Sequence, residues 1–171
     1  MDSIQGYLQL EHDNLVSMIN ALVALKRDKL NSEFQTAWGK CEFSFRRHSR
    51  MEDDILNPQY LTAFKNSADP NWTKYNSSIL AFEKTLEELF SSSPTEENLT
   101  AFLSSFVAHN KMEENHLASK LDATLTTPER AKLLSQLRAE PGAASATKLK
   151  SSSPPPLSHA ELGQKTTTSP R

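Results

Sequence analysis

The chain has 171 residues, of which 37% are hydrophobic and only four are glycine, a composition that disfavours a turn-rich β protein and suits long helices. No segment approaches the ~20 apolar residues that span a bilayer, and the first residues lack the basic and apolar regions of a signal peptide, so we expect a soluble, cytoplasmic protein without a membrane partner. The formal net charge is −2 and no basic patch with interleaved aromatic residues occurs, which argues against nucleic acid as a partner.

The first two predicted helices both carry polar residues on their apolar faces. The first covers residues 3–30, where apolar side chains recur at alternating spacings of four and three. Its expected inward face consists of Leu8, His12, Leu15, Ile19 and Leu22. A second helix is expected to follow Ser32 as its N-cap and to stop at Pro58, because proline lacks the backbone N–H that a helix interior needs. Its inward face consists of Phe34, Trp38, Cys41, Phe45, His48, Glu52 and Ile55.

The remaining predicted helices follow a loop over residues 57–69 that holds one short helical turn. A third helix is expected to begin at Pro70, since proline is favoured at the first helical position. Its inward face consists of Trp72, Tyr75, Ile79, Phe82, Leu86 and Leu89, without a histidine. The fourth helix is expected to start at a capping box of Ser93 and Glu96. Its inward face consists of Leu99, Phe102, Phe106, His109, Glu113 and Leu117. A fifth, shorter helix is expected to follow Thr127 as its cap and to bury Ala131, Leu134 and Leu137.

Four amphipathic helices joined by short loops predict an all-α fold, an antiparallel up-down-up-down four-helix bundle, with the fifth helix packed across one end. We assign residues 1–140 to this domain. Residues 141–171 are rich in serine, threonine and proline and have no apolar period, so we predict a disordered C-terminal tail. Two Ser-Pro pairs in it, Ser153-Pro154 and Ser169-Pro170, resemble phosphorylation sites and favour a protein partner that binds through the tail.

The polar residues on the inward faces predict a metal site. His48 and Glu52 are four residues apart, as are His109 and Glu113, and this spacing puts both side chains on one face of a helix, about 6 Å apart along its axis. In an antiparallel bundle, His12 falls at the same end and at a similar height. A single such histidine is more often a hydrogen-bonded core or surface residue, but five of these residues in one layer favour a shared cation.

The chemistry of this layer indicates which ion it binds. Buried carboxylates and histidines are costly unless they are paired or bound to metal. A pocket with both nitrogen and carboxylate oxygen atoms suits iron, manganese or zinc and disfavours calcium. No nucleophile with an adjacent base, phosphate loop or nucleotide fingerprint occurs, so an enzyme assignment would rest on metal redox chemistry alone, and we favour a protein that is not an enzyme.

The same segments resemble the hemerythrin-like, or HHE cation-binding, domains over about residues 5–139. The resemblance rests on the Glu-His-Asp-Asn-Leu around His12, on His48-Ser-Arg-Met-Glu52 and the residues up to Pro58, and on His109-Asn-Lys-Met-Glu113-Glu. It implies that His12, His48 and His109 are terminal ligands of a diiron centre that Glu52 and Glu113 bridge. Members of the family bind oxygen reversibly or sense oxygen, iron or redox state. The resemblance therefore implies a non-haem iron protein with O2 or another small ligand as its partner.

The third helix departs from this family, which usually places one or two histidines near its start. Here Tyr75 on the inward face, or Asn76 beside it, is the candidate that replaces the missing ligand. The open alternatives are a diiron site with a vacant coordination position, a mononuclear site, a structural ion, and a bundle without metal. In the last case the expected function is a helical interaction module with a regulatory tail.

Overall fold

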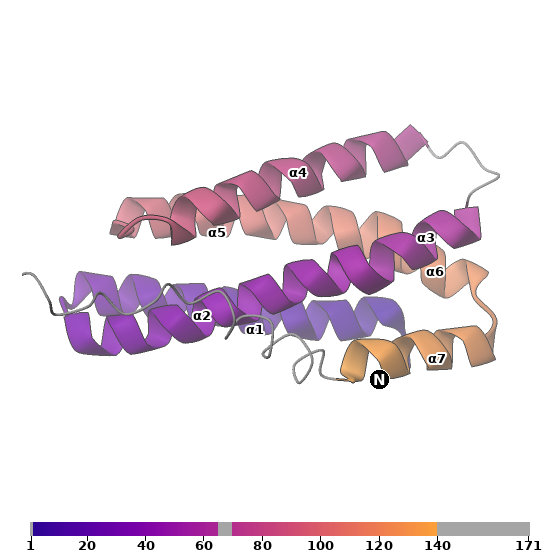
Figure 1. Ribbon diagram of the computed structural model, residues 1–171, viewed down its shortest axis with the longest axis horizontal. Coiled ribbons are helices and arrows are strands. Elements are labelled where there is room, and N and C mark those ends of the chain that lie inside the picture. The colour runs from indigo at the N-terminus through magenta and orange to yellow at the C-terminus, as the bar shows by residue number, and fades with distance from the viewer. Residues whose placement is uncertain (1, 65–69, 140–171) are drawn as a thin grey trace, which may run out of the picture. The chain divides into compact units, whose positions relative to one another are not determined.

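A computed structural model of the chain describes residues 2–64 and 70–139. These residues form helices and short connections without a β-strand, which confirms the all-α prediction (Figure 1). The elements in chain order are α1 (Ile4–Arg27), α2 (Asn31–Met51), η1 (Glu52–Leu56), α3 (Asn57–Phe64), α4 (Pro70–Phe90), α5 (Glu96–Met112), η2 (Glu113–Ala118), α6 (Ser119–Thr124) and α7 (Thr127–Arg138), where η marks a π-helical segment. The predicted tail, residues 141–171, and part of the predicted loop lie outside the described residues.

The first two helices are joined by a tight turn. The Ser3 side chain accepts a hydrogen bond from the Gly6 N–H and starts α1 as expected. The chain reverses at Lys29, which has a left-handed φ of 58°. This reversal puts Leu30 at the start of α2, where it makes no side-chain cap bond. The predicted Ser32 N-cap is therefore wrong: Ser32 already lies inside the first turn.

The second predicted helix does not stop at Pro58. α2 passes through η1 into α3, so the chain stays helical to Phe64. In η1 the Asn57 N–H bonds to the Glu52 carbonyl five residues earlier. In a regular α-helix, Pro58 would leave one backbone hydrogen bond unmade, and its ring would clash with the preceding turn. The wider π-helical turn avoids both costs. The extra residue also shifts the buried face, so that Leu56 is buried where Ile55 was predicted to be.

Two predicted helix starts lie elsewhere than expected. The capping box of α5 consists of Thr95 and Asn98 rather than Ser93 and Glu96, with the Thr95 side chain on the Asn98 N–H at 3.2 Å and the Asn98 side chain on the Thr95 N–H at 3.0 Å. Extended backbone at Thr95 allows this pairing, and Glu96 instead binds Arg27 at 2.7 Å.

The start of α7 is displaced in the same way. Its capping box joins Thr126, not Thr127, to Glu129. Leu133 is buried in place of the predicted Ala131, which is exposed. Leu134 and Leu137 are buried as predicted. The helix packs against α1 and η1, and the Tyr7 hydroxyl donates to the Leu137 carbonyl at 2.8 Å.

The long helices enclose two separate apolar clusters. α1 packs against α2 and α5, and α4 packs against α5, as Figure 1 shows. One cluster contains Leu8, Met51, Leu56, Tyr75, Leu117 and Leu134 among others. The other contains Leu15, Ile19, Phe45, Phe82, Phe102 and Phe106 among others. The buried histidines and glutamates lie between them in the sequence of each helix, as His12 does between Leu8 and Leu15, so they form a polar layer across the core. None of the described helices is both long enough and apolar enough to cross a membrane.

Candidate metal centre

Four of the five predicted ligands lie together in the polar layer. One donor atom from each of His12, His48, Glu52 and Glu113 lies within 4.8 Å of all the others. The four residues come from α1, α2, η1 and η2, and each is at most 2% exposed. Two imidazoles and two carboxylates thus meet in a closed space of the size that one cation fills.

His12 is held at both of its ring nitrogens by consecutive glutamates. Its Nε2 lies 3.0 Å from Glu113 Oε2, and its Nδ1 lies 2.6 Å from Glu114 Oε1. The apolar stripe of the sequence favours Glu113 over Glu114 as the ligand, and it predicts that Glu114 is solvated or lies behind the ligands. The structure places Glu114 on the ring nitrogen that faces away from Glu113.

His48 approaches two carboxylates without forming a hydrogen bond. Its Nε2 lies 2.8 Å from Glu52 Oε1 and 3.9 Å from Glu113 Oε2, yet neither ring nitrogen meets the angular requirement for a hydrogen bond among the described residues. Glu113 Oε1 is likewise buried without a partner in this part of the chain. Unpartnered buried polar atoms are rare and costly. These atoms of His48 and Glu113 are therefore available to a cation.

The histidines and glutamates of the layer shift one another's pKa values toward the charged forms. Burial alone raises the pKa of Glu52, but the charge of His48, together with the charge and hydrogen bond of His109, outweighs it, so that the pKa lies below its usual range. Burial lowers the pKa of His12 and of His109, but their glutamate neighbours outweigh it and raise both above the usual value of 6.5. Without a metal, the layer is therefore stabilised by protons on imidazoles next to ionised carboxylates.

His109 lies outside the group of four. Its Nε2 is 3.5 Å from Glu52 Oε1, its Nδ1 has no partner among the described residues, and its ring stacks on Phe82 at 4.6 Å with an interplanar angle of 7°. Glu52 is thus shared between His48 and His109. The structure brings the fifth predicted ligand to the edge of the site and not into its centre.

Among its described side chains, α4 adds no nitrogen ligand to the layer. Asn76 is exposed, so it does not replace the missing histidine. Tyr75 is buried, and its hydroxyl donates to Asn57 Oδ1 at 3.3 Å. Burial first, and then the negative charges of Glu113 and Glu52, raise the pKa of Tyr75, which keeps the phenol neutral. Tyr75 is therefore a buried, protonated phenol that is bonded to Asn57.

Replacing Tyr75 with phenylalanine tests this assignment. Because only the bond to Asn57 is lost, we expect the variant to be destabilised by about 0.5–1.5 kcal/mol. Its metal content and its visible spectrum in the ferric state are expected to match those of the parent protein. Urea unfolding and absorption spectra of both proteins check this. A visible band that disappears in the variant would instead identify Tyr75 as a ligand.

Both candidate carboxylates stand at the first residue of a π-helical segment. Glu52 opens η1 and Glu113 opens η2. Such wide turns are rare and are frequently found at functional sites. The sequence analysis missed both of them. The one available signal was that the apolar stripe continues to Tyr60, beyond a proline that should end a regular helix.

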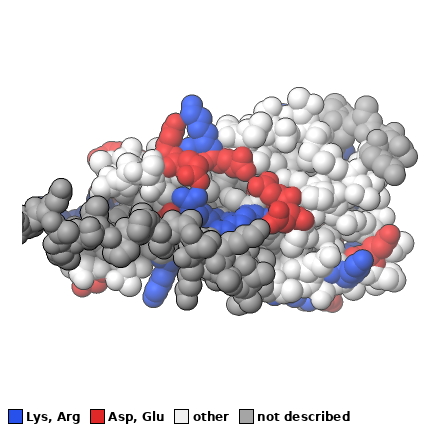
Figure 2. All heavy atoms as spheres, in the orientation of Figure 1, with Lys and Arg blue, Asp and Glu red and all other residues white. Residues whose placement is uncertain are grey.

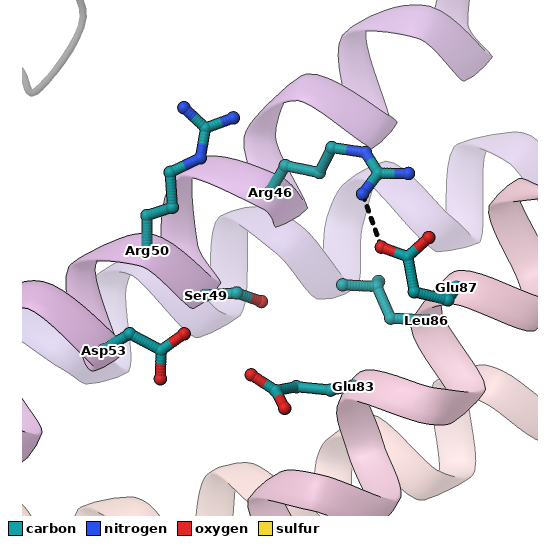
Figure 3. Close-up of a pocket in the computed structure, with 7 residues that line it drawn as sticks. All are labelled: Arg46, Ser49, Arg50, Asp53, Glu83, Leu86 and Glu87. Atoms are coloured by element: carbon teal, nitrogen blue, oxygen red, sulfur yellow. Dashed lines mark hydrogen bonds and ion pairs between the residues drawn. The ribbon is translucent and has the colours of Figure 1, made fainter. Parts of the chain in front are cut away.

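A surface pocket of about 310 Å³ lies beside the layer, between α2, η1 and α4 (Figure 3). It is lined by Arg46, Ser49, Arg50, Asp53, Glu83, Leu86 and Glu87. Asp53 and Glu83 face each other across it, and Arg46 binds Glu87 at 2.6 Å. Acidic and basic side chains lie intermingled in the middle of the face shown in Figure 2. None of the four central donors lines this pocket, so the donor layer is closed on this side.

The other candidate residues have ordinary environments. Cys41 is buried, and burial raises the pKa of its thiol to about 12, so it is a core residue as predicted and not a thiolate ligand. Glu11 binds Arg47 at 2.7 Å and His116 is half-buried. His159, which falls in the predicted disordered tail and is therefore not expected to be a ligand, lies outside the described residues.

The chain was compared with models of protein families, with curated proteins and with solved structures. No family model, curated protein or solved structure matches it. The assignment of function therefore rests on the polar layer itself.

Proposed function

We propose that this protein binds non-haem iron in an antiparallel four-helix bundle of the hemerythrin-like class. The observation that carries the proposal is the buried group of His12, His48, Glu52 and Glu113, whose donor atoms lie within 4.8 Å of one another. Atoms of His48 and Glu113 have no hydrogen-bond partner among the described residues, and a bound cation would satisfy them, whereas a purely structural polar cluster would leave them unsatisfied.

The donor set favours iron over its competitors. Calcium and magnesium prefer oxygen ligands alone, and a structural zinc site is usually closed by four ligands in a tetrahedron. Here two nitrogen and two oxygen donors have His109 next to them as a fifth, which suits the larger coordination number of iron or manganese. Iron held here would supply ligand binding and redox chemistry.

The arrangement also suggests two unequal metal positions. The group of four provides the first. His109 and the shared Glu52 provide part of a second, whose remaining side faces the protonated Tyr75 and the ring of Phe82. An under-ligated position is where oxygen or another small molecule binds to a protein-held metal. We therefore favour a role in binding or sensing oxygen, iron or redox state over catalytic turnover.

The proposal is tested by expressing the protein with iron available and measuring its metal content and its visible spectrum. We expect one to two iron ions per chain, and absorption that changes on reduction and again on exposure to oxygen. The control is the same protein with both His12 and His48 replaced by leucine, which should contain no iron. Parent protein free of bound metal under these conditions would contradict the proposal.

The second candidate is a metal-free helical interaction module. It is favoured by the side of the layer that faces α4, where the buried residues are Tyr75, Ile79 and Phe82 and no nitrogen donor is present among the described residues. In that case the polar layer would serve to fix how the helices pair, and a folded protein without metal would be the result of the same experiment.

A further inference from the structure

We propose that Glu114 is a positioning residue for the metal centre: its carboxylate fixes the ring of His12 so that Nε2 faces the site. The inference rests on the proposed metal-binding function. It assigns a role to a residue whose own carboxylate lies outside the group of four donors.

The geometry around His12 distinguishes the two neighbouring glutamates. Glu113 Oε2 approaches Nε2, the nitrogen on the side of His48, whereas Glu114 Oε1 approaches Nδ1 at the shorter distance of 2.6 Å. A neutral imidazole carries one proton, and the nitrogen without it is the metal ligand. A carboxylate that accepts the Nδ1 proton therefore leaves Nε2 free for a cation.

The two carboxylates also differ in exposure. The Glu113 side chain is completely buried, whereas that of Glu114 is 17% exposed. Glu114 is thus in contact with both water and His12, and it needs no cation of its own. Glu113 has an oxygen without a partner in the described part of the chain and does need one.

The helix geometry explains how one ring meets both residues. Successive side chains of a regular α-helix point about 100° apart, which normally sends one of them away from a shared partner. Glu113 and Glu114 are the first two residues of the π-helical η2, and the His12 ring lies between their carboxylates. A carboxylate on the outer nitrogen of a metal-binding histidine orients the ring and strengthens it as a ligand.

The test uses three variants of the full chain. Glu114→Ala removes the acceptor, and Glu114→Gln keeps an acceptor oxygen without the charge. Glu88→Ala is the matched control, because the Glu88 side chain is 67% exposed and lies 3.8 Å from the Lys84 ammonium, outside the polar layer. Fe²⁺ is added to metal-free protein without oxygen, and its affinity is measured by competition with a chelator. We expect Glu114→Ala to bind 10–100-fold more weakly than the parent, Glu114→Gln to lie between them and Glu88→Ala to match the parent. Parental affinity in Glu114→Ala would overturn the proposal.

A second measurement separates this inference from the proposed function. In metal-free protein with isotope-labelled histidine, the Nδ1 proton of His12 should give an NMR signal protected from exchange with water. That signal should persist in Glu114→Gln and Glu88→Ala and vanish in Glu114→Ala. If the parent protein binds no Fe²⁺, the proposed function fails, but this signal still decides whether Glu114 holds the ring. An unchanged signal in Glu114→Ala refutes the positioning role in either case.

Discussion

Replacing His48 with leucine is expected to abolish metal binding, whereas His109→Leu is expected to leave one ion bound. The two histidines are equally buried, and both lie next to Glu52. Only His48 belongs to the group of four donors. Loss of a ligand from that group should weaken binding by more than the 10–100-fold that is typical of residues behind the ligands, while loss of His109 should affect only the second position.

Iron content and Fe²⁺ affinity of the two variants provide the measurement. Leucine fills most of the space of the imidazole and offers no donor atom, and circular dichroism establishes that both variants are folded. If the parent protein holds two ions, His109→Leu should hold one; if the parent holds one, His109→Leu should be unchanged. Equal losses in the two variants would show that His109 belongs to the same site as His48.

The metal-free and the metal-loaded protein are expected to respond to alkaline pH in opposite directions. His12 and His109 have pKa values raised above 6.5 in the folded protein, so the stability they contribute is complete below that pH and is lost as the pH rises through the raised values. The pKa of Glu52 is lowered below 4.5, so its contribution is present above that pH and is lost as the pH falls further. The metal-free protein should therefore be most stable between about pH 4.5 and 6.5.

With iron bound, the protein should become more stable as the pH rises, because protons compete with the metal for imidazole and carboxylate. At a metal concentration about 1,000 times Kd, the added stability is about 4 kcal/mol, which raises Tm by roughly 10–20 °C for a domain of this size. Urea unfolding as a function of pH, without oxygen and with or without Fe²⁺, measures the pH dependence of stability for the metal-free and the iron-loaded protein. The double variant His12→Leu with His109→Leu should lack the alkaline decline, and a decline of parental size in it would assign the effect to other groups.

Much of the fold followed from local patterns. The apolar spacing in α1 identified Leu8, His12 and Leu15 as one buried face, and all three are buried. The four-residue spacing of His48 and Glu52 placed them together, because the period of a helix is a local property. The choice of His12, His48, Glu52, His109 and Glu113 as neighbours also came from the sequence, through the expected alternation of helix directions, and the structure groups four of these five.

Local patterns failed where two rules compete within a few residues. Pro58 should end a helix, yet the π-helical turn of η1 carries the chain past it. Thr95 rather than Ser93 caps α5, because the choice between neighbouring hydroxyl residues depends on which backbone is extended. Both errors are displacements of a boundary and leave the helices and their inward faces largely unchanged.

By itself, then, the sequence determined which side chains face inward and at what depth, because helical periodicity and burial follow from neighbours in the chain. Only the tertiary structure decided that Glu114 binds His12, that His109 stacks on Phe82 outside the group of four, and that Tyr75 is tied to Asn57. These contacts join residues of different helices, 102 positions apart for His12 and Glu114. They depend on how far each packed helix is rotated about its axis, and two wide turns at Glu52 and Glu113 set that rotation where the site is formed.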